Sequence, residues 1–336
     1  LLLAAMPVAA QWQFMGLFPP GGVAAGDTLE TGNGMHGITV TPDNRVWMHN
    51  YYSYSRDSIL VPDYVIMKAA PNADQDSVYV SRYVPVRTIH VYNAAGTPAP
   101  LSPIKTVTLP GGKIDTIGFW RMPGYGAYAG IKAYRPTGIT GKIVSSPNTN
   151  RGMRYGAGKV YVAIYGQIYM IDYTDGNTAT KVVVDSLNSG IAPGIDADGN
   201  FYWNRVVAGN QPMKIYDNSG NFIGNAKDSL TGYSRTALAK GSTAGATDVY
   251  FADYTSHRVL QLHSDNGILG PFSVADTVLK GMDVESMEWH PKTGHLWASA
   301  GSYNDMPNRY LGTVTSYSPG GWYGYDVAAK TIEDSL

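Results

Sequence analysis

The sequence predicts an all-β protein, a β-propeller, from three observations. One strand–turn–strand pattern recurs along the 336 residues, the recurrence has the length of a propeller blade, and no apolar pattern of helical period extends beyond two turns. In each recurrence a small residue leads into an apolar strand, a tight turn and a second strand centred on an aromatic residue. The aromatic residues in register are Trp47, Tyr161, Tyr202, Tyr250 and Trp297.

The second half of each unit completes a blade. A third strand runs into a turn rich in Gly, Asn or Asp, residues that suit tight hairpins, at 89–96, 168–176, 214–220, 260–267 and, less regularly, 322–330. The units close on an Asp, a Ser or Thr and an aliphatic residue, at 115–117, 185–187, 228–230, 276–278 and 334–336. The last four aromatic positions are 41, 48 and 47 residues apart, which is the period of four short antiparallel strands. We therefore expect five clear four-stranded blades, with a sixth left open.

The chain divides into three segments. Residues 1–10 resemble the apolar tail of a signal peptide or form an ordered N-terminal arm, residues 11–36 form an N-terminal strand or arm, and residues 37–336 form the propeller. Two long insertions, at about 53–86 and 118–150, are rich in Tyr, Pro and Gly. They are either elaborated loops or a degenerate sixth blade.

Composition excludes several functional classes. Lys and Arg number 25 against 26 Asp and Glu, so the net charge of −1 provides no basic surface for nucleic acid. The chain has no Cys, which excludes disulfides, zinc–thiolate sites and thiol nucleophiles. No later stretch reaches the roughly 20 apolar residues of a transmembrane span. Because Val8 and Ala10 suit the positions before a signal-peptide cleavage site, the sequence predicts a secreted protein, extracellular or at the cell surface.

The strand–turn segments GITVTPDNRVWM, GIDADGNFYW and ESMEWHPKTGHLWASAG are typical of one group of propellers. Over about residues 30–336 the chain resembles secreted bacterial propellers of the NHL and gluconolactonase-like superfamily. The resemblance implies a fold rather than a reaction, because such turns recur in propellers with unrelated roles. Gluconolactonase-like enzymes hold a divalent metal with a Glu, an Asn and an Asp; Glu285 and Asn150 match the first two, and no Asp matches the third. We therefore expect no metal, no cofactor and no catalytic residues.

Polar residues at the start of the inner strands are the candidate ligand-binding site, because propellers gather binding groups at one mouth of the central channel. Two Arg, a His and a Glu around one funnel would hold a carboxylate or a sugar. The alternative is a polar plug, in which Arg235 pairs with Glu285 and side chains seal the channel, because most buried charges are paired. The candidate residues are His36, Asn150, Arg151, Ser234, Arg235 and Glu285.

Two further motifs resemble sites but are predicted to be structural. The segment 196–200 begins like a calcium loop and lacks the distal carboxylate of such a loop, so we interpret it as a hairpin turn. Glu285 and Glu288 are three residues apart, so we expect them on opposite faces of a strand and not in one cluster with His290 and His295.

Aromatic loops and the apolar N-terminus indicate a protein–protein role. Tyr numbers 25 against 7 Trp and 7 Phe, and only 15% of the residues are charged, which favours self-association. We predict a non-catalytic subunit of an extracellular filament or surface layer whose partner is itself, with residues 1–18 on or in the next subunit. The alternative is a propeller that binds a glycan or small molecule in the funnel, or a lactonase-like hydrolase. The candidate interface residues are Leu1, Leu2, Leu3, Trp12, Phe14, Phe18, Tyr51, Tyr52, Tyr54, Trp120, Tyr125, Tyr128, Trp322 and Tyr323.

Overall fold

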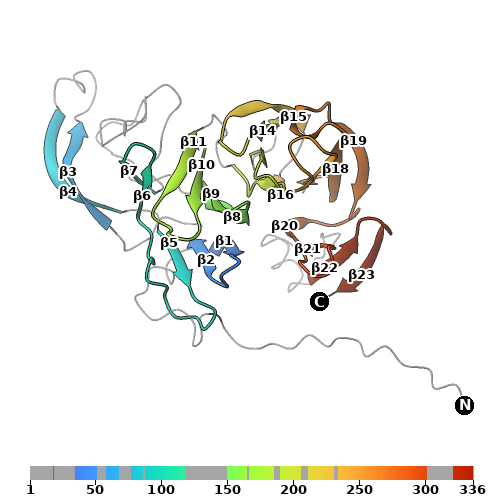
Figure 1. Ribbon diagram of the computed structural model, residues 1–336, viewed down its shortest axis with the longest axis horizontal. Helices are drawn as coiled ribbons and strands as arrows, with labels where there is room; N and C mark the ends of the chain where they lie inside the picture. Colours follow the sequence, from blue (N-terminus) through green and yellow to red (C-terminus); the bar gives the residue numbers. More distant parts are fainter. Residues whose placement is uncertain are drawn as a thin grey trace, which may run out of the picture.

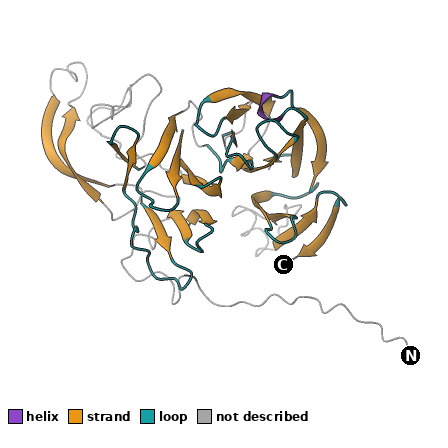
Figure 2. Cartoon of the chain, in the orientation of Figure 1, coloured by secondary structure: helices purple, strands orange, loops and turns teal. Residues whose placement is uncertain are grey.

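Antiparallel sheets follow one another around a central axis in the computed structural model of the chain (Figure 1). Strands dominate the described residues, and the single helix among them is a short 3₁₀ turn, η2 (Gly267–Leu269) (Figure 2). No helix in this described part has the length and apolar character needed to cross a membrane. The structure describes residues 18, 35–50, 58–67, 77–85, 88–117, 150–164, 166–184, 190–205, 211–230, 234–253, 255–300 and 321–335.

Five of the sheets are the blades, each numbered here in chain order. Blade 1 contains β1 (Met35–Val40), β2 (Val46–Asn50) and β5 (Ile89–Tyr92). Blade 2 contains β8 (Asn150–Gly156), β9 (Lys159–Ile164), β10 (Gln167–Asp172) and β11 (Ala179–Val184). Blade 3 contains β12 (Gly194–Ile195), β13 (Phe201–Trp203), β14 (Gln211–Tyr216) and β15 (Phe222–Leu230).

The C-terminal third of the chain forms two regular blades. Blade 4 contains β16 (Ser234–Lys240), β17 (Thr247–Asp253), β18 (Arg258–Ser264) and β19 (Ser273–Val278). Blade 5 contains β20 (Val284–Trp289), β21 (Leu296–Ala300), β22 (Gly321–Asp326) and β23 (Thr331–Ser335). Five blades in an all-β propeller confirm the predicted fold class.

Blade 1 departs from the four-stranded pattern. Its fourth position holds the irregular segment 98–104, which is tied to β5 by backbone hydrogen bonds between Ile89 and Ile104 and from Ala99 to Val91. This segment contains Pro98, Pro100 and Pro103, which cannot donate to a strand ladder, so a regular strand does not form there.

Two hairpins stand outside the five blades. The first unit was expected to close at 115–117, but these residues end a separate hairpin, β6 (Thr106–Leu109) and β7 (Lys113–Thr116). Thr108 bridges to Thr178, so this hairpin lies beside blade 2. The other hairpin, β3 (Ser58–Met67) and β4 (Ser77–Pro85), lies between β2 and β5 in the sequence and forms its own two-stranded sheet.

The hydrophobic core lies between successive blades. One cluster joins blades 1 and 2, a second joins blades 2, 3 and 4, and a third joins blades 4 and 5. The in-register aromatics all lie on the second strand of their blades, as predicted. Trp47, Tyr161, Tyr202 and Tyr250 are fully buried in these clusters, whereas Trp297 is half-buried. Burial raises the phenol pKa of Tyr161, Tyr202 and Tyr250 well above the ordinary value for Tyr.

The aromatics also give a common register for the inner strands. Directly across from them, on the first strand of each blade, lie Thr39, Arg154, Gly194, Leu238 and Glu288. Residues directly opposite in an antiparallel pair share a face of the sheet, so these five occupy equivalent positions around the axis. The register therefore places a cation and an anion, Arg154 and Glu288, at equivalent sites on blades 2 and 5.

Candidate functional site

Arg154 is the charged side chain that links the inner strands around the axis. It lies on β8, is 6% exposed, and reaches three other blades. Its Nε donates to the Pro193 carbonyl before blade 3 at 2.9 Å, and one terminal nitrogen lies 2.6 Å from a Glu288 oxygen on blade 5. The other terminal nitrogen donates to the Thr236 hydroxyl on blade 4 at 3.2 Å and to the Met287 carbonyl at 3.1 Å.

This arrangement uses the guanidinium as a fork with fixed geometry. A planar guanidinium presents five donors, and here they meet a carboxylate, a hydroxyl and two carbonyl oxygens. The Glu288 side chain is 57% exposed, so the pair is buried at its cationic end and open to solvent at its anionic end. The group therefore ties blades 2 to 5 together and uses four of the five donors of the guanidinium for contacts within the protein.

One alternative from the sequence was a polar plug of paired charges. The alternative in which Arg235 pairs with Glu285 stays a prediction, because the Arg235 side chain is not described; an ion pair that is described joins Arg154 to Glu288. The side chain of Arg235 lies outside what the structure describes, as do those of His36, Asn150, Arg151 and Ser234. Their backbones lie within the first three residues of β1, β8 and β16, at the same end of the inner strands.

A β-bulge stands at the start of four inner strands. The extra residue is His36 in β1, Arg151 in β8 and Glu285 in β20, while β16 has the pair Arg235 and Thr236 opposite one residue of β17. Bulges re-aim a side chain and interrupt the alternation of faces, and they are frequent beside functional sites. The ring of bulged polar residues at this mouth of the channel is the second candidate site.

The bulges interrupt simple alternation along the inner strands. Counting by twos from Arg151 or Glu285 assigns the wrong face to residues further along, because each bulge inserts one residue. Gly152 follows the bulge in β8 with a φ of +139°, and a Cβ there would lie 2.4 Å from the Ala192 side chain. Close contact between blades 2 and 3 therefore requires glycine at this position.

The hairpin turn predicted at 196–200 is confirmed. Asp196 Oδ1 accepts from the backbone N–H groups of Asp198 and Asn200, at 3.0 and 2.9 Å, and Oδ2 accepts from the Asn200 side chain at 2.8 Å. Asp217 repeats the arrangement with Ser219 and Asn221. Both carboxylates are occupied by the donors of their own turn, which is the structural use of such a loop.

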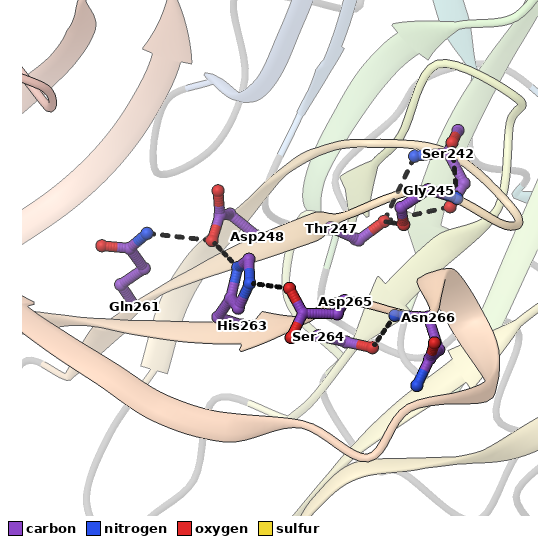
Figure 3. Close-up of polar contacts among 9 residues, drawn as sticks. All are labelled: Ser242, Gly245, Thr247, Asp248, Gln261, His263, Ser264, Asp265 and Asn266. Atoms are coloured by element: carbon purple, nitrogen blue, oxygen red, sulfur yellow. Dashed lines mark hydrogen bonds and ion pairs between the residues drawn. The ribbon is translucent and has the colours of Figure 1, made fainter.

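A polar cluster that no sequence pattern indicates lies on blade 4 (Figure 3). His263 lies between two carboxylates, with Nδ1 2.8 Å from Asp248 and Nε2 3.1 Å from Asp265, and Gln261 donates to the same Asp248 oxygen at 2.9 Å. Hydrogen bonds to Asp248 and then Asp265 raise the pKa of His263 above its ordinary value. Asp248 and His263 are directly opposite in β17 and β18, so only a known register would have revealed the pair.

Nothing in the described residues gathers three or more His, Asp or Glu side chains in a geometry that would hold a metal ion.

Three of the candidate interface residues lie among the described residues. Phe18 packs edge-on against Tyr92 at 6.1 Å between ring centroids, Trp322 is exposed on β22, and Tyr323 is half-buried beside it. The other eleven candidates lie outside the described residues: Leu1, Leu2, Leu3, Trp12, Phe14, Tyr51, Tyr52, Tyr54, Trp120, Tyr125 and Tyr128.

Comparison with known proteins finds only distant structural similarity. No protein-family model and no curated protein matches this sequence. Among solved structures, a putative 6-phosphogluconolactonase from Bacteroides uniformis ATCC 8492 is 10% identical over 89% of this chain and 70% of its own, with a TM-score of 0.42. The WD40 beta propeller domain of Doa1 is 8% identical over 90% and 82%, with a TM-score of 0.45. The computationally designed Ika8 protein is 8% identical over 80% and 68%, with a TM-score of 0.36.

Proposed function

We propose that this chain is a non-catalytic propeller that acts through protein–protein contacts, as a self-assembling subunit of an extracellular filament or surface layer. The observation that carries the proposal is the set of large apolar side chains left exposed on the blades. Besides Trp322 they include Ile38, Val40, Phe222, Val274 and Ile332. Ile38 and Val40 lie on the same face of β1, and adjacent exposed apolar residues on a chain with few charges favour association.

The channel supports the same conclusion. Arg154 crosses between the inner strands and bonds the protein with four of its five donors, which supports a structural role for this part of the channel. A guanidinium that bonds carbonyl oxygens and a carboxylate of neighbouring blades holds those blades together, and this is a structural role and not a catalytic one.

Sedimentation velocity of the purified chain over a range of concentrations, with negative-stain electron microscopy, tests the proposal. We expect species well above the 36.2 kDa of one chain, growing with concentration, and regular filaments or sheets on the grid. A single monomeric boundary at every concentration, with no ordered particles, would refute the proposed function.

The bulges favour a second candidate function, binding of a small anionic ligand or glycan at the channel mouth. Four inner strands bulge at the polar residues His36, Arg151, Arg235 and Glu285, and two of these are permanently cationic. A ligand that binds only the folded chain raises its melting temperature by mass action. We expect a rise with carboxylate-bearing sugars that is lost in Arg151→Gln, and no rise across such a panel would remove this candidate.

A further inference from the structure

The blades in the middle of the propeller are buried on both faces. In blade 2, Tyr161 belongs to the hydrophobic cluster shared with blades 3 and 4, whereas Val162, the next residue, belongs to the cluster shared with blade 1. Successive residues of a strand point to opposite faces of the sheet, so the two clusters lie on its two sides. We call the face directed to the following blade the leading face, and the face directed to the preceding blade the receiving face.

Among the described residues, no blade precedes blade 1 in the chain. Its leading face carries Trp47 and Val91, which belong to the cluster between blades 1 and 2. Figure 1 shows blades 1 and 5 at the two ends of the arc of sheets, and no described hydrophobic cluster has members in both. The receiving face of blade 1 would therefore be exposed if the blades alone covered one another.

The receiving face of blade 1 is buried over two of its three strands. On β1 this face is open, since Ile38 is 57% exposed. Met48 and His90 lie directly across the sheet from Ile38, on β2 and β5, and Tyr92 is two residues further along β5. These side chains share the face of Ile38, yet Met48 is 1%, His90 7% and Tyr92 3% exposed.

The cover on this face comes from the N-terminal side of the chain. Met48 and Tyr92 belong to none of the three hydrophobic clusters that join the described blades. Phe18 packs edge-on against Tyr92, with 6.1 Å between the ring centroids. Phe18 is 38% exposed, so the greater part of this residue is removed from water.

We propose that the receiving face of blade 1 is a docking site for the N-terminal segment of the same chain, with Phe18 as the anchor that binds at Tyr92. The segment takes the place that a preceding blade takes elsewhere in the propeller. An aromatic anchor suits this place, because the boundary between blades 4 and 5 uses the same edge-on contact, between Tyr250 and Trp289. The proposal does not depend on the proposed self-assembly.

The position of Phe18 in the sequence favours docking within one chain. Residues 19–34 join Phe18 to β1, which is a strand of the same blade. A short tether of this kind keeps an anchor beside its site at an effective concentration of about millimolar. A second copy would have to reach a similar concentration in solution before its Phe18 could compete for the site.

Thiol labelling of the full chain tests the docking, because the chain has no Cys and each introduced thiol reports on one position. Met48→Cys reports on the covered part of the face, and Ile38→Cys reports on its open part. We expect a maleimide to label the thiol of Ile38→Cys at least about 30-fold faster, because a buried thiol reacts only after a local opening. Adding Phe18→Asp to Met48→Cys should speed its labelling about 10-fold, whereas Phe18→Leu, which stays apolar, should change the rate less than about 3-fold.

Met153→Cys is the matched control. Met153 lies on the receiving face of blade 2, is 3% exposed, and is covered by blade 1 in the cluster that joins the two blades. Phe18→Asp should leave its slow labelling unchanged. If Met48→Cys stays equally protected when Phe18→Asp is added, Phe18 does not cover the face and the inference is wrong. Equal acceleration at Met48→Cys and Met153→Cys would mean that the whole propeller loosens, and would also overturn docking at blade 1.

The concentration dependence of labelling separates docking within one chain from docking on a second copy. The protection of Met48→Cys should be the same at every concentration, including those at which sedimentation shows only the monomer. Protection that disappears on dilution would assign Phe18 to a second copy and overturn the inference. The proposed self-assembly is decided by sedimentation alone, so the failure of one proposal is distinguishable from the failure of the other.

Discussion

Two regions of the molecule use equivalent strand positions in different environments. At the boundary between blades 4 and 5 the residues at these positions are buried, and at the ends of the blade arc they are more exposed. At the boundary Tyr250 packs edge-on against Trp289 at 5.4 Å between ring centroids, and Met287 is buried beneath them. At the ends, Ile38 takes the position of Met287 and is open to solvent. The repeat therefore determines which side chains are directed at a neighbour, and only the assembled structure determines whether that neighbour is present.

The largest expected effect contrasts Met287→Asp with Ile38→Asp. A carboxylate in the blade 4–5 core replaces apolar packing with a buried charge and should cost about 4 kcal/mol or more of unfolding free energy. The same change at Ile38 should alter the stability of the monomer by less than about 1 kcal/mol. Urea denaturation followed by tryptophan fluorescence, below the association concentration, measures both. Similar losses at the two positions would show that Ile38 is covered within the monomer.

Tyr250→Ala and Trp297→Ala sharpen the same contrast on the leading faces. Removing the fully buried ring should cost about 3–5 kcal/mol, through lost burial and the cavity left behind. Trp297 is half-buried, so its removal should cost roughly half as much or less in the monomer, although Trp is the larger residue. Tyr250→Phe, which keeps the ring, is the control and should lose under about 1.5 kcal/mol. Equal losses for the two Ala variants would contradict the contrast.

Arg154→Met tests the hydrogen bonds by which Arg154 joins the inner strands of blades 2 to 5. The substitution keeps the bulk of the side chain and leaves the Pro193 and Met287 carbonyls without their donor, so we expect a loss of about 3 kcal/mol. Arg154→Lys should not restore it, because an ammonium group cannot span four acceptors in a plane. Glu288→Gln should cost less than about 1 kcal/mol, because that side chain is largely exposed. Thermal and urea denaturation compare the three, and full stability in the Lys variant would reject the fork interpretation.

The propeller could be predicted from sequence because its signal is repeated and local. Turns such as 196–200 and 217–221 fold through their own Asp and Asn side chains, and the aromatic positions recur at blade spacing. The site could not be predicted in the same way, because Arg154 finds its partners 39 to 134 residues away. The face of β8 on which the Arg154 side chain lies also depends on the bulge at Arg151, and no local sequence pattern indicates this bulge.

Blade 1 shows the other limit of sequence reasoning. Its unit was expected to close at 115–117, and the strand signal there is real, since β7 forms. The hairpin nevertheless pairs beside blade 2, and the proline-rich segment 98–104 takes the outer place in blade 1. Strand propensity indicates that a segment is extended, whereas its partner is chosen by long-range packing.

The smallest expected effect on stability lies at His263. Its cluster with Asp248 and Asp265 is partly exposed, in contrast to the buried Arg154 side chain. Hydrogen bonds to Asp248 and Asp265 raise the pKa of this His in the folded chain above its unfolded value. The protonated form is therefore favoured by folding: the stabilisation is fully present below about pH 6.5 and is lost as the pH rises through the raised folded pKa. His263→Gln should accordingly lose stability at pH 5.5 and almost none at pH 9.

The magnitude follows from solvent exposure. His263 is about one-third exposed, so screening should keep the effect at pH 5.5 below about 1 kcal/mol and reduce it further in 1 M salt. Asp248→Asn is the matched control, because it keeps the size of the partner and removes its charge, and most of the pH dependence should disappear with it. The measurement is the difference in urea midpoint between each variant and the unaltered chain at the two pH values. A His263→Gln loss that is the same at both would mean that the cluster holds the β17–β18 hairpin by neutral hydrogen bonds alone.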